Sequence, residues 1–247
     1  MSKLQDYIDV LKSKSDWETY LMAESGLPGP RGNLELAAAV AECGDKAFAE
    51  RYLSYDPVTA PENTPRVFLV FCSLGVLGRL ITESHSEYFP TLRGFASDPR
   101  WRVREGVAIA LQRVGRWDMD ALLAEMQKWK DGNWLEKRAV AAALAEPDLL
   151  KDPEDVHTIL QLLDSITASL LPSPDHDEDF MVLRQSLGYC WSVVAVALPE
   201  EGKPLMEKWF ANPDKHIHWV MKENLKKNRL AKMDAEWVKH WSQQLSS

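Results

Sequence analysis

The residues best suited to metal chemistry gather in one short acidic stretch of the sequence. A histidine and three aspartates stand close together there, at Asp175, His176, Asp177 and Asp179. Carboxylate and imidazole groups are common metal ligands, but adjacent ligands on a proline-bounded loop do not form a preorganised site. No second cluster supplies the remaining ligands. We therefore predict a solvated linker in this stretch and no metal site.

The other groups with catalytic potential lack the spacing that catalysis needs. His216 and His218 lie two positions apart, and on a helix they would point to different faces. Cys43, Cys72 and Cys190 are an odd set without CxxC spacing, which favours a reducing compartment over disulfides or zinc. The chain contains no GxSxG, GxxxxGK[ST] or GxGxxG motif. We predict no catalytic residue, no cofactor and a cytoplasmic location, and we expect a binding protein more than an enzyme.

The composition bounds the class of protein. The chain has 247 residues, is 45% hydrophobic, and carries 37 acidic residues against 29 lysines and arginines, a net charge of -8. This acidity argues against a nucleic-acid partner, since such proteins usually carry a basic balance. The N-terminus has no apolar signal region, and the run Val67–Ile81 is shorter than the roughly 18 residues of a spanning helix. We expect a buried core helix there and no membrane association.

Helix signals recur along the whole chain, whereas alternation with a period of two is hard to find. A capping residue followed by proline occurs at Thr64, Asp98, Asp152 and Asn212, which is a typical helix start. After the second of these, apolar residues follow at helical spacing. One buried stripe is therefore expected from Val103, Val107, Ala110, Leu111 and Val114.

The sequence also repeats itself. Residues 98–111 align without gaps on residues 131–144, so that Trp101 meets Trp134 and Arg104 meets Lys137. Weaker copies begin near residues 178 and 212, and two more near 30 and 65. Repeats of this length indicate an array of stacked helix pairs. We predict N-terminal helices in 1–28, repeats in 29–230 and a capping helix in 231–247, with second helices near 30–43, 64–82, 99–114, 132–145, 178–197 and 213–229.

One copy resembles a known family. Residues 98–111 contain Asp98-Pro99, Val103-Arg104, Val107-Ala108 and Ala110-Leu111. This pattern resembles the second helix of a HEAT repeat, which has an Asp-Pro start, then Val-Arg, then a ridge of small residues. The resemblance implies an all-α fold, an α-solenoid of about six HEAT-like helix pairs. It also implies a non-enzymatic scaffold that binds a protein or peptide on its concave face, because HEAT arrays mostly serve as binding scaffolds.

The arginine position of that pattern gives a candidate site. It is filled in successive copies by Arg104, Lys137, Arg184 and His218, which would form a basic ladder on adjacent second helices. Two interpretations stay open: the cations pair with aspartates of neighbouring repeats, or they line a groove for an acidic peptide or a phosphate-bearing ligand. The candidate binding residues also include nearby aromatic and basic positions, namely Trp101, Trp134, Trp219 and Lys222.

An enzyme remains the alternative. The chain is similar in size to the HEAT-like alkylpurine DNA glycosylases, which hold damaged DNA with tryptophans, basic residues and one carboxylate. That resemblance would add Trp191, Arg138, Lys226 and the carboxylate of Asp131 to the candidate residues above. The net charge of -8 weighs against it, because a protein that grips a phosphate backbone needs cations.

Overall fold

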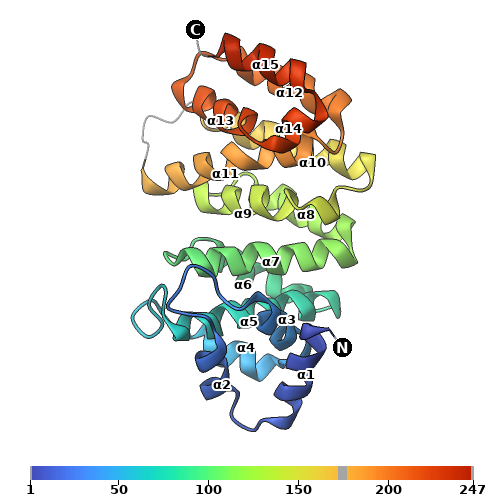
Figure 1. Ribbon diagram of the computed structural model, residues 1–247. Coiled ribbons are helices and arrows are strands. Elements are labelled where there is room, and N and C mark those ends of the chain that lie inside the picture. Colours follow the sequence, from blue (N-terminus) through green and yellow to red (C-terminus); the bar gives the residue numbers. More distant parts are fainter. Residues whose placement is uncertain (1, 172–176, 246–247) are drawn as a thin grey trace. The chain divides into compact units, whose positions relative to one another are not determined.

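The protein is entirely helical in the part of the chain that the computed structural model describes, residues 2–171 and 177–245 (Figure 1). No strand occurs among these residues, so the predicted all-α class is confirmed. The chain divides into two compact units, Met1–Asp118 and Met119–Ser247. Each unit has its own layers of helices and its own apolar core.

The first unit arranges its described α-helices in two layers. In one layer, four helices pack side by side in chain order: α1 (Lys3–Ser13), α3 (Leu34–Cys43), α5 (Pro65–Thr82) and α7 (Trp101–Trp117). The second layer contains α2 (Trp17–Glu24) and α4 (Lys46–Leu53), which pack against α5, and α6 (Phe89–Ala96), which packs against α7. A short 3-10 turn at Ser86–Tyr88 precedes α6.

The second unit has the same layered arrangement. The neighbours α9 (Trp134–Leu144), α11 (Glu178–Ala195) and α13 (Lys215–Leu225) form one layer. In the other, α10 (Pro153–Ala168) packs between α8 (Met119–Trp129) and α12 (Pro199–Phe210). The chain then continues through α14 (Asn228–Met233) and α15 (Ala235–Gln244), and α15 packs against both α13 and α14. A second 3-10 turn lies at Pro147–Leu149.

Helix α5 is the centre of the first unit. It is long and apolar enough to cross a membrane by composition alone, but 72% of the stretch is buried within the protein. Its neighbours α3, α4 and α7 cover it on several sides. The expected core helix is therefore present, and α3 and α7 pack on either side of it.

The predicted helices and the predicted stripe agree with the structure to within a few residues. Each predicted second helix corresponds to one observed helix, from α3 to α13, and all five stripe residues of α7 are buried. The helix starts lie within four residues of the predicted ones, but two of the predicted capping residues, Asp98 and Asn212, do not occupy the capping position. Helix α7 begins at Trp101 because Asp98 binds Arg100 and does not cap the helix, and α13 begins after Asp214, which takes the capping role expected of Asn212.

Candidate functional site

A groove lies over α5, between α3 and α7, in the first unit. It consists of two adjoining cavities of about 340 and 380 Å³, which share Leu34 and Phe71 in their linings. Because α7 contributes lining residues from Trp101 to Arg116, the groove runs along most of that helix. At the helical rise of about 1.5 Å per residue, this stretch is roughly 22 Å long. The groove therefore has the length of a short peptide segment.

Small and apolar side chains make up the middle of the groove. Helix α3 contributes Ala38 and Ala41, and α7 contributes Ile109. Gly75 lies in the floor on α5, where an added Cβ would stand only 3.2 Å from the Cβ of Ala41. Its missing side chain thus allows α3 to pack closely against α5 and leaves the floor open. Such a surface suits apolar side chains from a ligand.

Arginines edge the groove at both ends. Arg31 and Arg102 line the first cavity, and Arg113 and Arg116 line the second. Glu105 is the one acidic residue among the lining residues of the two cavities. Two of the four arginines pair with glutamates next to the groove, Arg102 with Glu62 and Arg113 with Glu42, so the rim carries charges of both signs.

Arg102 is held by contacts on several sides. Its Nη2 donates to the carbonyl oxygen of Gly29 at 2.7 Å, and its Nε lies 3.2 Å from a carboxylate oxygen of Glu62. The guanidinium also stacks on the indole of Trp101, 4.4 Å from the ring centroid. Trp101 remains 44% exposed. This end of the groove thus has an exposed aromatic ring, held in place by a buried arginine that is 6% exposed.

Arg113 spans the other end of the groove. Its two terminal nitrogens donate to the two carboxylate oxygens of Glu42, at 2.7 and 3.1 Å. Arg113 belongs to α7 and Glu42 to α3, so the ion pair links the two walls. The hydrogen bonds from Arg113 hold the pKa of Glu42 below its ordinary value. The pair is a bidentate contact of the kind that arginine makes with carboxylates in general.

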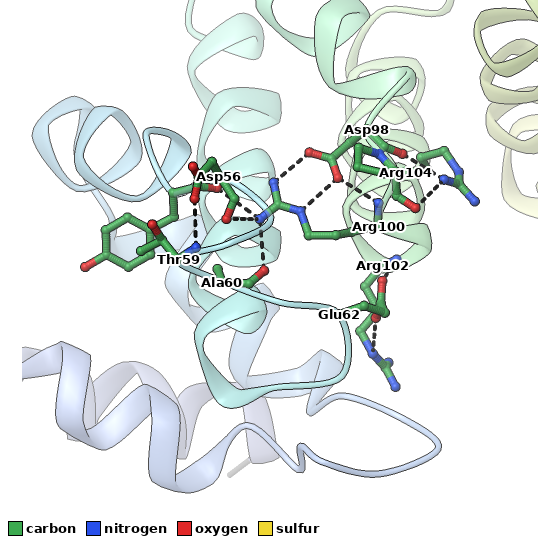
Figure 2. A network of polar contacts seen from close by, with 10 residues as sticks. Asp56, Thr59, Ala60, Glu62, Asp98, Arg100, Arg102 and Arg104 are labelled. Atoms are coloured by element: carbon green, nitrogen blue, oxygen red, sulfur yellow. Dashed lines mark hydrogen bonds and ion pairs between the residues drawn. The ribbon is translucent and has the colours of Figure 1, made fainter.

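A buried network behind the groove fixes the start of α7 (Figure 2). Arg100 is 3% exposed, and its Nε and Nη2 donate to the two carboxylate oxygens of Asp98 at 2.8 and 2.6 Å. Its Nη1 donates to the carbonyl oxygens of Tyr55, Asp56 and Ala60. These bonds tie the loop between α4 and α5 to the chain just before Trp101. The loop and the helix start are therefore held together, which places Trp101 and Arg102 at the groove.

Arg104, the first predicted member of the basic ladder, helps to build the same helix start. Its Nη1 donates to the carbonyl oxygens of Asp98 and Pro99 at 2.7 and 2.9 Å (Figure 2). The buried arginine–aspartate ion pair of this motif is formed by Arg100. Among the residues predicted from the sequence, Trp101 lines the groove, whereas Arg104 supports its frame.

The remaining predicted residues lie in the second unit. Lys137 lies over the ring of Trp134 at 4.6 Å, and the guanidinium of Arg184 lies 3.8 Å from the ring centroid of Trp219. Burial lowers the pKa of both cations, Lys137 and Arg184. These predicted residues therefore form two cation–aromatic pairs, one on α9 and one between α11 and α13.

The same layer of the second unit carries a row of aromatic rings at its helix starts. Phe180 makes edge-on contacts with Trp134, at 5.5 Å, and with His216, at 5.0 Å. His218 is half-buried on α13, and Lys222 is exposed one turn further along that helix. The predicted ladder positions on α9, α11 and α13 thus lie on neighbouring helices.

The predicted absence of a metal site receives only a partial test. Asp175 and His176 lie outside the described residues. Within residues 2–171 and 177–245, no group of three or more His, Cys, Asp and Glu side chains is arranged to hold a metal ion. All three cysteines are free thiols.

Sequence reasoning missed most of the groove. Glu42 and Arg113 are 71 positions apart, and nothing in either local sequence indicates their pairing. Arg31 lies in a glycine- and proline-rich segment, residues 26–32, which has no recognised ligand-binding pattern. The usable signals were the alanine run of residues 37–39 and the glycine Gly75 inside a helical pattern, since both indicate close packing or an open surface.

Comparison with known proteins gave no further assignment. No protein-family model matches the chain, and neither a curated protein nor a solved structure shows significant similarity to it.

Proposed function

We propose that this chain is a non-enzymatic binding protein of the HEAT-like type, and that the groove in its first unit holds an apolar peptide segment of a partner protein. The observation that carries the proposal is the pair of adjoining cavities over α5, with an apolar middle and arginines at both ends. Helix pairs stacked in two layers, as seen in each unit, are the arrangement on which a HEAT-like α-solenoid would be built.

A peptide suits this groove better than a nucleic acid. Its middle is lined by Gly75 and by alanine, leucine, phenylalanine and isoleucine side chains, which match apolar groups and offer no cation to a phosphate backbone. The DNA glycosylase alternative would use Trp134 and Trp219 in the second unit. Their rings are already in contact with cations of this protein, Lys137 and Arg184. The net charge of -8 and the three free thiols fit a protein-binding role in a reducing cytoplasm.

Selection from a phage-displayed library of random 12-residue peptides tests the proposal. The full chain is the bait, and the recovered peptides are synthesised and titrated by fluorescence anisotropy. The groove is blocked by Ala38→Trp, which adds a large side chain at an exposed lining position and leaves the core intact. The matched control is Ala124→Trp, at an exposed position on α8.

We expect the selected peptides to bind Ala38→Trp at least about tenfold more weakly than wild type, because the indole excludes them from the groove. This loss corresponds to about 1.4 kcal/mol of binding free energy. Binding to Ala124→Trp should be unchanged. Recovery of no peptide, or equal binding to both variants, would refute the groove as a peptide site. A titration with duplex DNA at two salt concentrations tests the alternative. Tight binding that weakens steeply with salt would favour a nucleic-acid function.

A further inference from the structure

The ion pair between Arg113 and Glu42 occupies one end of the groove. Arg113 is a lining residue of the second cavity, beside Ala110 and Ile109, whereas Glu42 approaches it from the opposite wall on α3. The two carboxylate oxygens of Glu42 thus lie where an arginine would bind the carboxylate of a ligand. The apolar surface next to Arg113 would contact the groups that precede such a carboxylate.

This pair can exchange at little cost. The side chain of Arg113 is 29% exposed and that of Glu42 is 42% exposed, so water reaches both partners. Ion pairs with this exposure contribute little to stability, because water screens both charges. After its release from Arg113, Glu42 would still lie near the positive charge of Arg79, which also lowers the pKa of Glu42. Arg79 is itself anchored by the carbonyl oxygens of Ala41 and Gly44.

We propose that Glu42 is an internal substitute for a ligand carboxylate: the bound segment carries an aspartate or glutamate next to its apolar residues, and that side chain displaces Glu42 from Arg113. This inference rests on the proposed function, since it concerns an occupant of the same groove. It adds the chemical class of the partner, an acidic peptide with apolar anchors. Arg116, which lines the same cavity, places a second cation at this end of the groove.

The alternative occupants of an arginine site are less well matched. A phosphate group would also bind a guanidinium, but it carries more negative charge than the carboxylate it would displace, and the released Glu42 would remain close to it. A carboxylate exchanges one for one with Glu42 and leaves the local charge balance unchanged at Arg113. The geometry of the existing pair, with two parallel contacts at 2.7 and 3.1 Å, is already that of a bound carboxylate.

The test uses a peptide selected on the full chain, together with a second version in which each acidic residue is replaced by its amide. Both are titrated against the wild type, Glu42→Gln and Arg113→Gln. The matched control is Arg51→Gln, because Arg51 also pairs with a glutamate of a neighbouring helix, Glu18, but lies outside the groove. A melting curve of each variant verifies folding.

We expect the acidic peptide to bind wild type about tenfold more tightly than its amide version, as a charge-assisted pair of about 1.5 kcal/mol would give. Glu42→Gln should strengthen binding of the acidic peptide by up to about fivefold, since the competing pair is worth at most about 1 kcal/mol. Arg113→Gln should remove the difference between the two peptides, and Arg51→Gln should preserve it.

Other outcomes separate the two proposals. Groove-dependent peptides that bind equally well as acids and as amides would refute the carboxylate site and leave the groove intact. Weaker binding in Glu42→Gln would also refute it, because Glu42 would then support the ligand. A phosphorylated version of the peptide that binds more tightly than the acidic one would assign the site to phosphate. If no selected peptide loses affinity in Ala38→Trp, both the peptide groove and the carboxylate site are refuted.

Discussion

Arg100 and Asp98 form a buried, bidentate ion pair across a single intervening proline, with side chains that are 3% and 8% exposed. The third guanidinium nitrogen reaches the carbonyl oxygens of the loop before α5. Every part of the guanidinium is thus bonded, which is the condition under which a buried charge is tolerated. The pair fixes the turn from which α7 begins, and through it one end of the groove.

Breaking this pair should destabilise the protein strongly. Arg100→Met would remove the guanidinium bonds to three carbonyl oxygens and would leave the charge of Asp98 buried without its counterion. We expect a loss of about 3–5 kcal/mol in the free energy of unfolding, measured by urea denaturation. The exposed Arg66→Met is the control. The double variant with Asp98→Asn should lose less than the sum of the single losses. A loss near zero for Arg100→Met would show that the pair is not formed.

The stripe of α7 gives a second stability prediction. Leu111 is fully buried, and replacing it by alanine removes apolar contacts and leaves a cavity. We expect Leu111→Ala to cost about 2–5 kcal/mol, as other large-to-small core substitutions do. Leu4→Ala, at an exposed position of α1, should cost far less. Equal losses for the two variants, measured by denaturation under one set of conditions, would contradict the burial of Leu111.

Asn224 links two helices of the second unit through a buried amide. It is 0% exposed; its Nδ2 donates to the carbonyl oxygens of Leu187 and Val220 at 2.8 Å, and its Oδ1 accepts from the backbone N–H of Ser192 at 2.8 Å. We expect Asn224→Leu to cost about 1–3 kcal/mol, because the groups it leaves behind lose their partner away from water. Asn228→Leu, at an exposed position, is the control for this thermal denaturation experiment.

The three thiols should differ in reactivity. Burial raises the pKa of Cys190 to about 11 and that of Cys72 well above its ordinary value, whereas Cys43 is only half-buried. The thiolate is the reactive form, so at pH 8 the buried thiols should react slowly. With an aromatic disulfide reagent, we expect one thiol to react in the native protein and three in denaturant. Fast native reaction that persists in Cys43→Ser would contradict this assignment.

Tyr52 should make stability depend on pH in the alkaline range. Burial, and then a hydrogen bond to Glu18, raise its pKa to about 12 from the ordinary value of 10.0. A raised pKa means that the folded state favours the neutral phenol. The contribution of Tyr52 to the free energy of unfolding is therefore complete below about pH 10 and is lost as the pH rises towards 12. The stability difference between wild type and Tyr52→Phe should shrink over that window; a constant difference would refute the shift.

The local sequence determined the secondary structure and the buried faces. Residues such as Val103, Val107 and Leu111 repeat at helical spacing, and that spacing dictates which face of α7 is apolar before any partner is known. The internal repeat predicted the residue ranges of six helices, and each range corresponds to an observed helix in one of the two units. These signals are short-range, because they depend on propensity and on the geometry of a single helix.

Tertiary structure decided which polar residues share a site. The sequence pattern singled out Arg104 near the start of α7, yet Arg100 forms the buried ion pair because the loop before α5 offers it three carbonyl oxygens. The pairing of Arg113 with Glu42 likewise depends on how closely α3 and α7 flank α5. Contacts between residues 71 positions apart are set by helix packing, and no local pattern in the sequence encodes them.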